Sequence, residues 1–268
     1  MSGWKLERVL EDCAKTDIAP SRDSMKQKLL SPKNLPIRER LIFALDVPGT
    51  DDAKKLVEAL GESVIFYKLG LEIFMAGGYF ELVDWLIARG KKVFVDLKFF
   101  DVPETVRSAV RQLKTRNVSF ATVHGNDAIL SAAANEKGGL KILAVTVLTS
   151  LDRADLESLG FQCDVLKLVL SRAKRALALG CDGVISSGLE ASQLRADLGE
   201  NFLVVTPGIR PVDNDVIDDQ KRIVTVEVAF QNGADYIVVG RPIKNAPDPR
   251  AAAEDIQNRI AALFSMGA

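Results

Sequence analysis

"VFVDLKFFDVPETV", residues 93–106, is the stretch that decides how the rest of the chain is read. It begins as an almost continuous apolar run, places Asp96, Lys98 and Asp101 within six positions, and then enters a proline turn and a helix-like segment. A strand without apolar/polar alternation is buried on both faces, which is typical of parallel sheets with helical crossovers. The stretch therefore predicts a buried parallel strand that ends in charged residues.

The same pattern recurs along the chain. Seven further strand-like apolar runs occupy residues 41–47, 63–70, 120–125, 141–149, 182–188, 201–208 and 235–242. Helix-like stretches lie between many of them, at residues 51–61, 79–90, 103–114, 165–180, 190–199 and 226–234. Eight strand and helix units predict an α/β fold, a TIM (β/α)8 barrel. A doubly wound sheet is the alternative, although no G-x-G-x-x-G follows any of the strands.

The first 38 residues do not share this rhythm. "WKLERVLEDCAK" (4–15) is compatible with an amphipathic helix, and the prolines of "SPKNLPIRER" (31–40) break it before the first strand. We therefore expect an N-terminal helical extension over residues 1–38 and a catalytic barrel domain over residues 39–268. The extension mixes acidic and basic residues without an apolar stretch, so we do not expect a secretory signal.

Composition narrows the class of protein. With 35 basic and 36 acidic residues the formal net charge is −1, which argues against nucleic acid or an anionic membrane as the main partner. Three cysteines without a CxxC pair and a single histidine argue against a disulfide framework and a zinc site. No apolar run approaches the roughly 20 residues that span a bilayer. We expect a cytoplasmic protein.

The carboxyl ends of the strands carry polar and charged residues, and this is where TIM barrels hold their active sites. These residues are Asp46, Lys68, Asp96, Lys98, His124, Thr146, Thr149, Ser186, Ser187, Pro207, Gly208, Gly240 and Arg241. We expect His124 to be a hydrogen-bonded structural residue, because a lone histidine at a strand end usually is. The other residues are candidates for one shared site.

Five charges are expected to meet at this rim. Asp96 and Lys98 are two residues apart on a strand and so face the same side, and Asp46, Lys68 and Asp101 join them. A structural ion-pair network is one interpretation, but buried pairs contribute little net stability, so a chemical role is favoured. Two chemistries remain open: a lysine that stabilises and protonates a carbanion, or acids that bind Mg²⁺.

The last two strands each end in glycine and arginine, in "VTPGIRP" (205–211) and "VVGRPI" (238–243). Glycine lets backbone N–H groups approach an anion, and arginine adds a forked donor. Barrel enzymes often bind phosphate at this place, so the ligand is expected to be a phosphorylated small molecule. The acidic run at 213–220 is expected to be a solvated loop, and its position also suits a lid.

Together these motifs resemble the orotidine 5′-phosphate decarboxylase family from about residue 40 to residue 260. The motifs are "LDV" (45–47), "YKLG" (67–70), "DLKFFDVPETV" (96–106), "VTVLTS" (145–150), "VTPGIRP" (205–211), "DDQKRI" (218–223) and "GADYIVVGRPI" (233–243). The resemblance implies decarboxylation of orotidine 5′-monophosphate to uridine 5′-monophosphate in de novo pyrimidine synthesis, without metal or organic cofactor. One departure is Val226, where the family usually has proline; we expect a neutral variant at a helix start.

The resemblance also implies roles for the charged residues. Lys98 would donate a proton to C6 of the pyrimidine, and Asp96 would lie near the substrate carboxylate. Asp46 and Lys68 would hold the ribose hydroxyls and complete the array of charges.

Further contacts with substrate are implied around this array. Asp101 and Thr105 would reach the site of the neighbouring subunit, which makes the protein a homodimer, and Thr149 would contact the pyrimidine. The remaining substrate-binding residues, most of them around the phosphate, would be Pro207, Arg210, Gln220, Gly240 and Arg241.

Two other functions compete with this one. A magnesium-dependent relative, a 3-keto-gulonate phosphate decarboxylase or a hexulose phosphate synthase, would share D-x-K-x-x-D but needs an acidic metal ligand where this chain has Lys68. A protonated lysine does not ligate Mg²⁺. A non-catalytic phosphate-binding protein would be marked by lost charges in the array, and none is lost.

Overall fold

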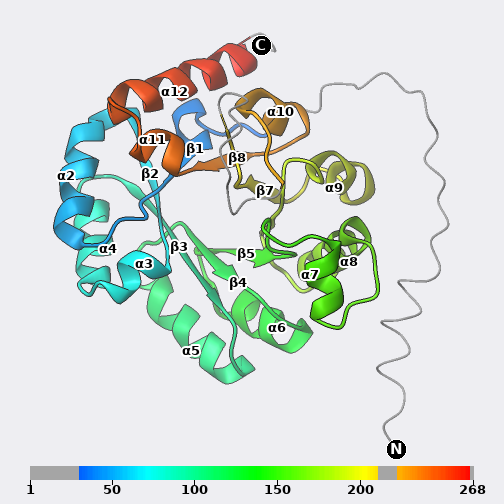
Figure 1. The fold of residues 1–268 in the computed structure, drawn as a ribbon. Helices are drawn as coiled ribbons and strands as arrows, with labels where there is room; N and C mark the ends of the chain where they lie inside the picture. The colour runs from blue at the N-terminus through cyan, green and yellow to red at the C-terminus, as the bar shows by residue number, and fades with distance from the viewer. Residues whose placement is uncertain (1–29, 211–221, 266–268) are drawn as a thin grey trace, which may run out of the picture.

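A computed structural model describes residues 30–210 and 222–265. Its strands form a closed parallel barrel in chain order, and β8 pairs with β1 (Figure 1). The strands are β1 (Leu41–Ala44), β2 (Phe66–Leu69), β3 (Lys92–Phe99), β4 (Phe120–Val123), β5 (Lys141–Val145), β6 (Gly183–Ile185), β7 (Leu203–Thr206) and β8 (Tyr236–Val239). The prediction of a TIM barrel is confirmed, and the doubly wound alternative is wrong because its sheet would be open.

Helices surround the barrel on the outside (Figure 1). They are α2 (Thr50–Leu60), α3 (Leu71–Met75), α4 (Tyr79–Ala88), α5 (Pro103–Lys114), α6 (Asp127–Glu136), α7 (Arg153–Ser158), α8 (Val165–Ala178), α9 (Ala191–Leu198), α10 (Val226–Gln231), α11 (Arg241–Lys244) and α12 (Pro249–Ser265), with 3₁₀ turns η1 (Ile37–Arg40) and η2 (Gly61–Ser63). Each of the six predicted helix-like stretches contains a helix. Helices α3, α6, α7, α11 and α12 lie outside the predicted stretches. None of the helices in the described part of the chain has the length and apolarity needed to cross a membrane.

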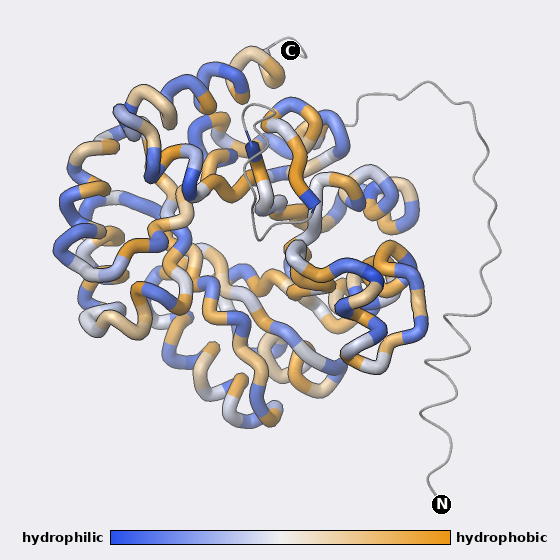
Figure 2. The backbone as a smooth tube through the Cα atoms, in the orientation of Figure 1, coloured by the Kyte–Doolittle hydropathy of each residue, from blue (hydrophilic) through white to orange (hydrophobic). Residues whose placement is uncertain are grey.

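Two apolar clusters form the core. One fills the space between strands and helices, and hydrophobic and hydrophilic positions alternate along the outer helices accordingly (Figure 2). The other fills the barrel interior with one or two inward-facing residues per strand, among them Phe66, Phe94, Phe120 and Tyr236. Ring centroids of these four side chains lie 5.0–6.0 Å apart where they touch. This aromatic layer closes the barrel beneath the carboxyl ends of the strands.

The residues that precede β1 cover the opposite, amino-terminal end of the barrel. Asp235, fully buried at the start of β8, accepts hydrogen bonds from Ser31 Oγ (2.5 Å) and Lys33 Nζ (3.1 Å). The other carboxylate oxygen of Asp235 accepts from Arg195 Nη2 at 2.7 Å, and Leu35 packs against the interior cluster. The helix expected at residues 4–15 lies outside the described residues.

Candidate active site

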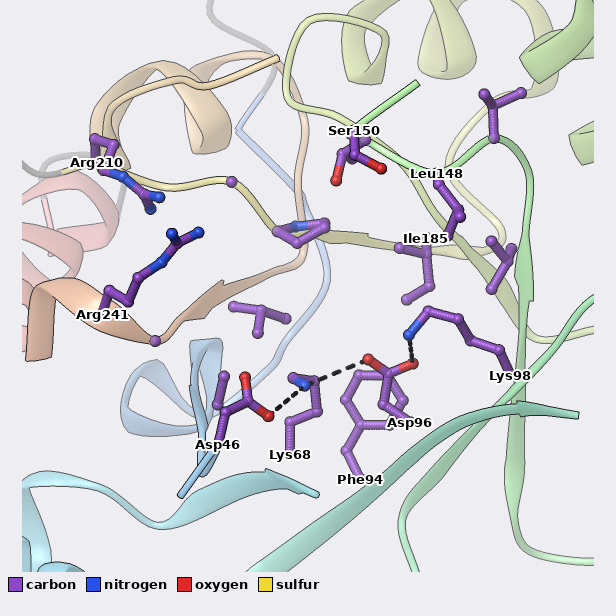
Figure 3. A pocket seen from close by; sticks show the side chains of 18 of the residues that line it. Asp46, Lys68, Phe94, Asp96, Lys98, Leu148, Ser150, Ile185, Arg210 and Arg241 are labelled. Carbon is purple, nitrogen blue, oxygen red and sulfur yellow. Dashed lines mark hydrogen bonds and ion pairs between the residues drawn. The ribbon is translucent and has the colours of Figure 1, made fainter. Parts of the chain in front are cut away.

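Four charged side chains form a continuous array at the carboxyl ends of the first three strands (Figure 3). Lys68 Nζ lies 3.3 Å from Asp46 Oδ1 and 3.4 Å from Asp96 Oδ2. Lys98 Nζ lies 3.0 Å from Asp96 Oδ1. We call Asp46, Lys68, Asp96 and Lys98 the charge array. The convergence expected from the sequence is therefore present, with acids and ammonium groups in alternation.

The positions of the charge array follow from the alternation of side chains along each strand, where every second residue points inward. Ala44, Phe66 and Phe94 point into the barrel interior. The next inward position on each strand is two residues later, which is Asp46, Lys68 and Asp96 in turn. The charges are thus the uppermost layer of the same series that builds the apolar interior.

Lys98 departs from regular strand geometry. Its φ is 49°, in the left-handed region, and the register between β3 and β4 shifts between Val95 and Phe99. The Lys98 amide donates to Thr122 Oγ1 (2.9 Å), and that hydroxyl donates to Asp96 Oδ1 (2.9 Å). A non-glycine residue held in this region costs on the order of 1 kcal/mol and is typical of a constrained functional position.

The electrostatics keep the buried members of the array charged. Burial on its own would lower the pKa of Lys68, but the Asp96 and Asp46 carboxylates outweigh it and raise that pKa above its usual value. Burial on its own would raise the pKa of Asp96, but Lys68 and Lys98 outweigh it and the pKa is lowered. At neutral pH Lys68 and Asp96 therefore both stay charged.

Gly70 leaves room for these charges. A Cβ at this position would lie 3.2 Å from Lys68 Nζ and 3.3 Å from Asp46 Oδ1. A side chain here would press on both groups, so the close approach of these charges favours glycine, whereas its φ does not.

The charge array forms one wall of a cavity of about 270 Å³, close to the lower end of the range for small-molecule sites. Most of the residues expected to act on substrate line this cavity, namely Asp46, Lys68, Asp96, Lys98, Thr149, Pro207, Arg210, Gly240 and Arg241. Apolar side chains complete the lining, and they include Val145, Val147, Leu148, Ile185 and Val238. A flat apolar ring flanked by polar groups suits this lining.

Two arginines lie on the side of the cavity away from Lys98 (Figure 3). Arg210 follows β7, after Gly208 with a φ of 77°, and Arg241 opens α11 after β8. Two guanidinium groups on adjacent loops suit an anion such as a phosphate. The cavity therefore has an anion-binding end and a charge-array end.

Two of the expected site residues in the described part of the chain lie outside this cavity. Asp101 and Thr105 are exposed where α5 begins, outside the cavity of their own chain. Asp101 Oδ1 instead accepts a hydrogen bond from the Val102 amide at 2.6 Å. Gln220 and the rest of the expected loop at 213–220 lie outside the described residues.

Some of the polar residues at strand ends turn away from the cavity. Thr146 Oγ1 donates to the Ile185 carbonyl at 3.0 Å, and Ser186 and Ser187 are buried beside Glu190. His124 packs edge-on against Phe100 with ring centroids 5.2 Å apart. Burial and the nearby Arg172 lower the pKa of His124. These residues do not line the cavity.

Three further residues belong to the site or support it, and none of them was predicted from the sequence. Lys244 lines the cavity and donates from Nζ to the Asp46 carbonyl at 2.7 Å. Ser150 lines it directly after Thr149, and Thr122 binds Asp96 from the next strand. Lys244 lies one helical turn after Arg241, so the helix period would have placed it on the same face. Thr122 is the inward strand position before His124, so the strand period of two would have placed it inside the barrel.

A family model described as "Orotidine 5'-phosphate decarboxylase / HUMPS family" matches residues 39–256. The chain belongs to this family. A protein of Methylococcus capsulatus named orotidine 5′-phosphate decarboxylase is 65% identical over 238 residues, which are 89% of this chain and 98% of that protein. One of the same name from Xanthomonas euvesicatoria pv. vesicatoria is 52% identical over 87% of this chain and 96% of its own length.

A solved structure of the same family has a similar fold. The crystal structure of orotidine 5′-phosphate decarboxylase from Lactobacillus acidophilus matches with a TM-score of 0.74 and 35% sequence identity, over 83% of this chain and 99% of that one. The resemblance found in the sequence is confirmed, and so is the interpretation of the chain as an enzyme of the orotidine 5′-phosphate decarboxylase family.

The departure at Val226 lies where a helix begins. Val226 is the first residue of α10, and Thr225 caps the helix by accepting from the Val228 amide at 3.3 Å. The first helical position favours proline because its amide would have no helical partner. With valine at this position, the cap by Thr225 is still formed.

Proposed function

We propose that the protein decarboxylates orotidine 5′-monophosphate to uridine 5′-monophosphate and CO₂ in de novo pyrimidine synthesis, without metal or organic cofactor. The observation that carries the proposal is a single cavity with an alternating Asp/Lys array at one end and two arginines at the other. Membership of the family and the names of the close relatives support the same reaction.

The two ends of the cavity orient the substrate. Arg210 and Arg241 bind the 5′-phosphate, and Asp46 with Lys68 meets the ribose hydroxyls. The pyrimidine then lies over the apolar lining with its carboxylate toward Asp96. Binding energy gained at the phosphate holds the reacting carbon in place, which is how a remote group accelerates a reaction.

The chemistry takes place between Asp96 and Lys98. The bond between C6 and the carboxylate carbon breaks, its electron pair stays on C6, and neutral CO₂ leaves. The Lys98 ammonium stabilises the carbanion and donates a proton to C6, and the neutral amine regains a proton from water. The fixed charge of Asp96 opposes the substrate carboxylate, and this repulsion disappears when CO₂ forms.

Asp101 and Thr105 are proposed to act in the site of a second copy of the chain. They are exposed beside apolar side chains with unusually large exposed fractions, Phe100 (68%) and Val102 (63%). Met75 of α3, the helix that follows the neighbouring strand β2, is 79% exposed. An apolar surface of this kind suits an interface, so a homodimer accounts for both the surface and the two polar residues.

A magnesium-dependent reaction on a sugar phosphate is the closest competitor within the family. Lys68 argues against it, because its ammonium group already lies within 3.4 Å of both Asp46 and Asp96. A divalent cation at these carboxylates would face a fixed positive charge. The Asp46 and Asp96 carboxylates are therefore already paired with the Lys68 ammonium group.

One assay tests the reaction and its independence from metal. Purified protein treated with EDTA is mixed with orotidine 5′-monophosphate, and the loss of its ultraviolet absorbance is followed. We expect full activity and, in D₂O, product with deuterium at C6. Absence of turnover would refute the proposal, and activity lost with EDTA but restored by Mg²⁺ would favour the competitor.

Mixing two inactive variants tests the shared site. Lys98→Met and Asp101→Ala each damage both sites of a homodimer, but a mixed dimer contains one site with both native residues. After subunit exchange we expect about a quarter of the wild-type activity, as the symmetry of a twofold dimer requires. No recovery in exchanged dimers would place Asp101 in its own chain's site.

Two further assignments remain proposals. We propose that residues 1–38 are an extension outside the catalytic barrel of residues 39–268. We also propose a cytoplasmic location, because the sequence has three widely spaced cysteines without a CxxC pair, as is usual in a reducing compartment.

A further inference from the structure

The loop after β5, residues 146–152, is held from outside by an arginine of another loop. Arg222 Nη2 donates to the Leu148 carbonyl at 2.8 Å and to the Val147 carbonyl at 3.4 Å. Thr149 and Ser150 come next in the chain, and both line the cavity. Arg222 therefore binds the two carbonyls that directly precede these cavity residues.

Glu190 in turn holds Arg222. Its Oε1 accepts a hydrogen bond from Arg222 Nη1, and its Oε2 accepts from Ser186 Oγ (2.9 Å) and the Ser187 amide (2.9 Å). The side chains of both partners are largely buried, with exposed fractions of 12% for Arg222 and 7% for Glu190. One ion pair thus joins the loops after β5, β6 and β7.

The joined loops are packed without spare room. A Cβ on Gly188, in the loop after β6, would lie 2.5 Å from Val224 Cγ2 in the segment after Arg222. Arg172 of α8 holds the start of the loop after β5 by donating to the Thr146 carbonyl at 2.6 Å. Consecutive carbonyls of this loop are therefore bound by guanidinium groups.

A buried ion pair contributes little to stability by itself, because desolvation offsets its attraction. This one connects the loops after β5 and β7, which both line the cavity, through Glu190 in the segment after β6. We propose that Arg222, held by Glu190, is a positioning residue that fixes the loop after β5 and so the contact of Thr149 and Ser150 with the pyrimidine ring. The identity of the ring rests on the proposed function.

The test compares two ligands that differ only in the base. Uridine 5′-monophosphate presents the pyrimidine ring and the phosphate, whereas ribose 5-phosphate lacks the pyrimidine. In Arg222→Ala we expect the affinity for uridine 5′-monophosphate to fall about 10-fold and that for ribose 5-phosphate to stay within about twofold, as loss of a charge-assisted hydrogen bond implies. Calorimetric titration measures both dissociation constants.

Turnover gives an independent readout. We expect kcat/KM of Arg222→Ala to fall about 30-fold and Arg222→Lys, which keeps the charge opposite Glu190, to regain part of it. Arg153→Ala is the matched control: Arg153 follows the same loop, but its pair with Glu157 is exposed. Its kcat/KM should stay within about twofold of wild type.

The outcomes separate this inference from the proposed function. If wild type decarboxylates the substrate and Arg222→Ala keeps kcat/KM within twofold at an unchanged Tm, the inference is wrong and the function stands. If both ligands weaken equally, Arg222 acts on the whole site and the inference is again wrong. Should Arg222→Ala fail to fold, Glu190→Gln must give the same selective loss. The binding comparison needs no turnover, so it tests Arg222 even if the reaction is different.

Discussion

Asp96 joins both ammonium groups of the array, and its replacement by asparagine removes the charge while keeping the size. Its oxygens lie 3.4 Å from Lys68 Nζ and 3.0 Å from Lys98 Nζ. At an effective dielectric constant of about 20, each contact carries about 5 kcal/mol of Coulomb attraction. Desolvation of the largely buried carboxylate offsets much of this, and breaking such a pair costs about 3–5 kcal/mol. For a barrel of this size Asp96→Asn should lower Tm by about 6–20 °C.

The pH dependence of this loss has a definite sign. The pKa of Asp96 is lowered in the folded protein because Lys68 and Lys98 outweigh its burial. A depressed pKa means that the carboxylate stabilises the fold above its unfolded pKa, and that this stability disappears as pH falls through the folded pKa. The difference in unfolding free energy between wild type and Asp96→Asn should therefore be full at pH 7 and shrink below about pH 4.

Urea unfolding at a series of pH values measures this difference. Asp46→Asn is the matched control, because the Asp46 side chain is 42% exposed and pairs with Lys68 at 3.3 Å. It should lose less than about 1 kcal/mol. The kcat/KM of Asp96→Asn should also fall by at least about 100-fold. An Asp96→Asn protein as stable as wild type at pH 7, or a difference that does not change with pH, would refute the electrostatic reasoning.

Three further changes have simple expected outcomes. Lys98→Met should reduce kcat by at least about 1,000-fold in the absorbance assay with substrate still bound, since the proposed proton donor is lost. Substantial turnover would assign the proton to another group. Arg241→Ala should lower kcat/KM by about 100-fold or more, because the proposed phosphate contacts are lost. Replacement of the exposed Arg250 by alanine should not lower it, and equal values for the two variants would contradict the anion site. Asp235→Ala should lower Tm by about 6–20 °C in calorimetry, because the buried Arg195 loses its buried carboxylate partner and keeps only the more exposed Glu200 at 3.3 Å. An unchanged Tm would contradict this.

The barrel could be predicted because strands buried on both faces leave continuous apolar runs. The same regularity placed Asp46, Lys68 and Asp96 at the rim, since each is the inward position after an apolar inward residue. Helix α6 was missed because its sequence, "DAILSAAANE", contains four alanines and lacks a clear polar face.

Other features depend on contacts between distant segments. The left-handed backbone at Lys98 arises from pairing with β4 and from Thr122, which no local pattern reveals. Glu190 and Arg222 are separated by 32 residues, so their pairing follows only from closure of the barrel. The roles proposed for Asp101 and Thr105 depend on a second chain, so they stay predictions.

The segment that covers the amino-terminal end of the barrel has a practical consequence. Ser31, Lys33 and Leu35 secure the chain on the face opposite the cavity mouth. A tag or carrier protein joined just ahead of residue 30 would start from that far face, leaving nucleotide entry unobstructed. Immobilisation through this point should therefore preserve turnover, whereas coupling through the loops around Arg241 should block it.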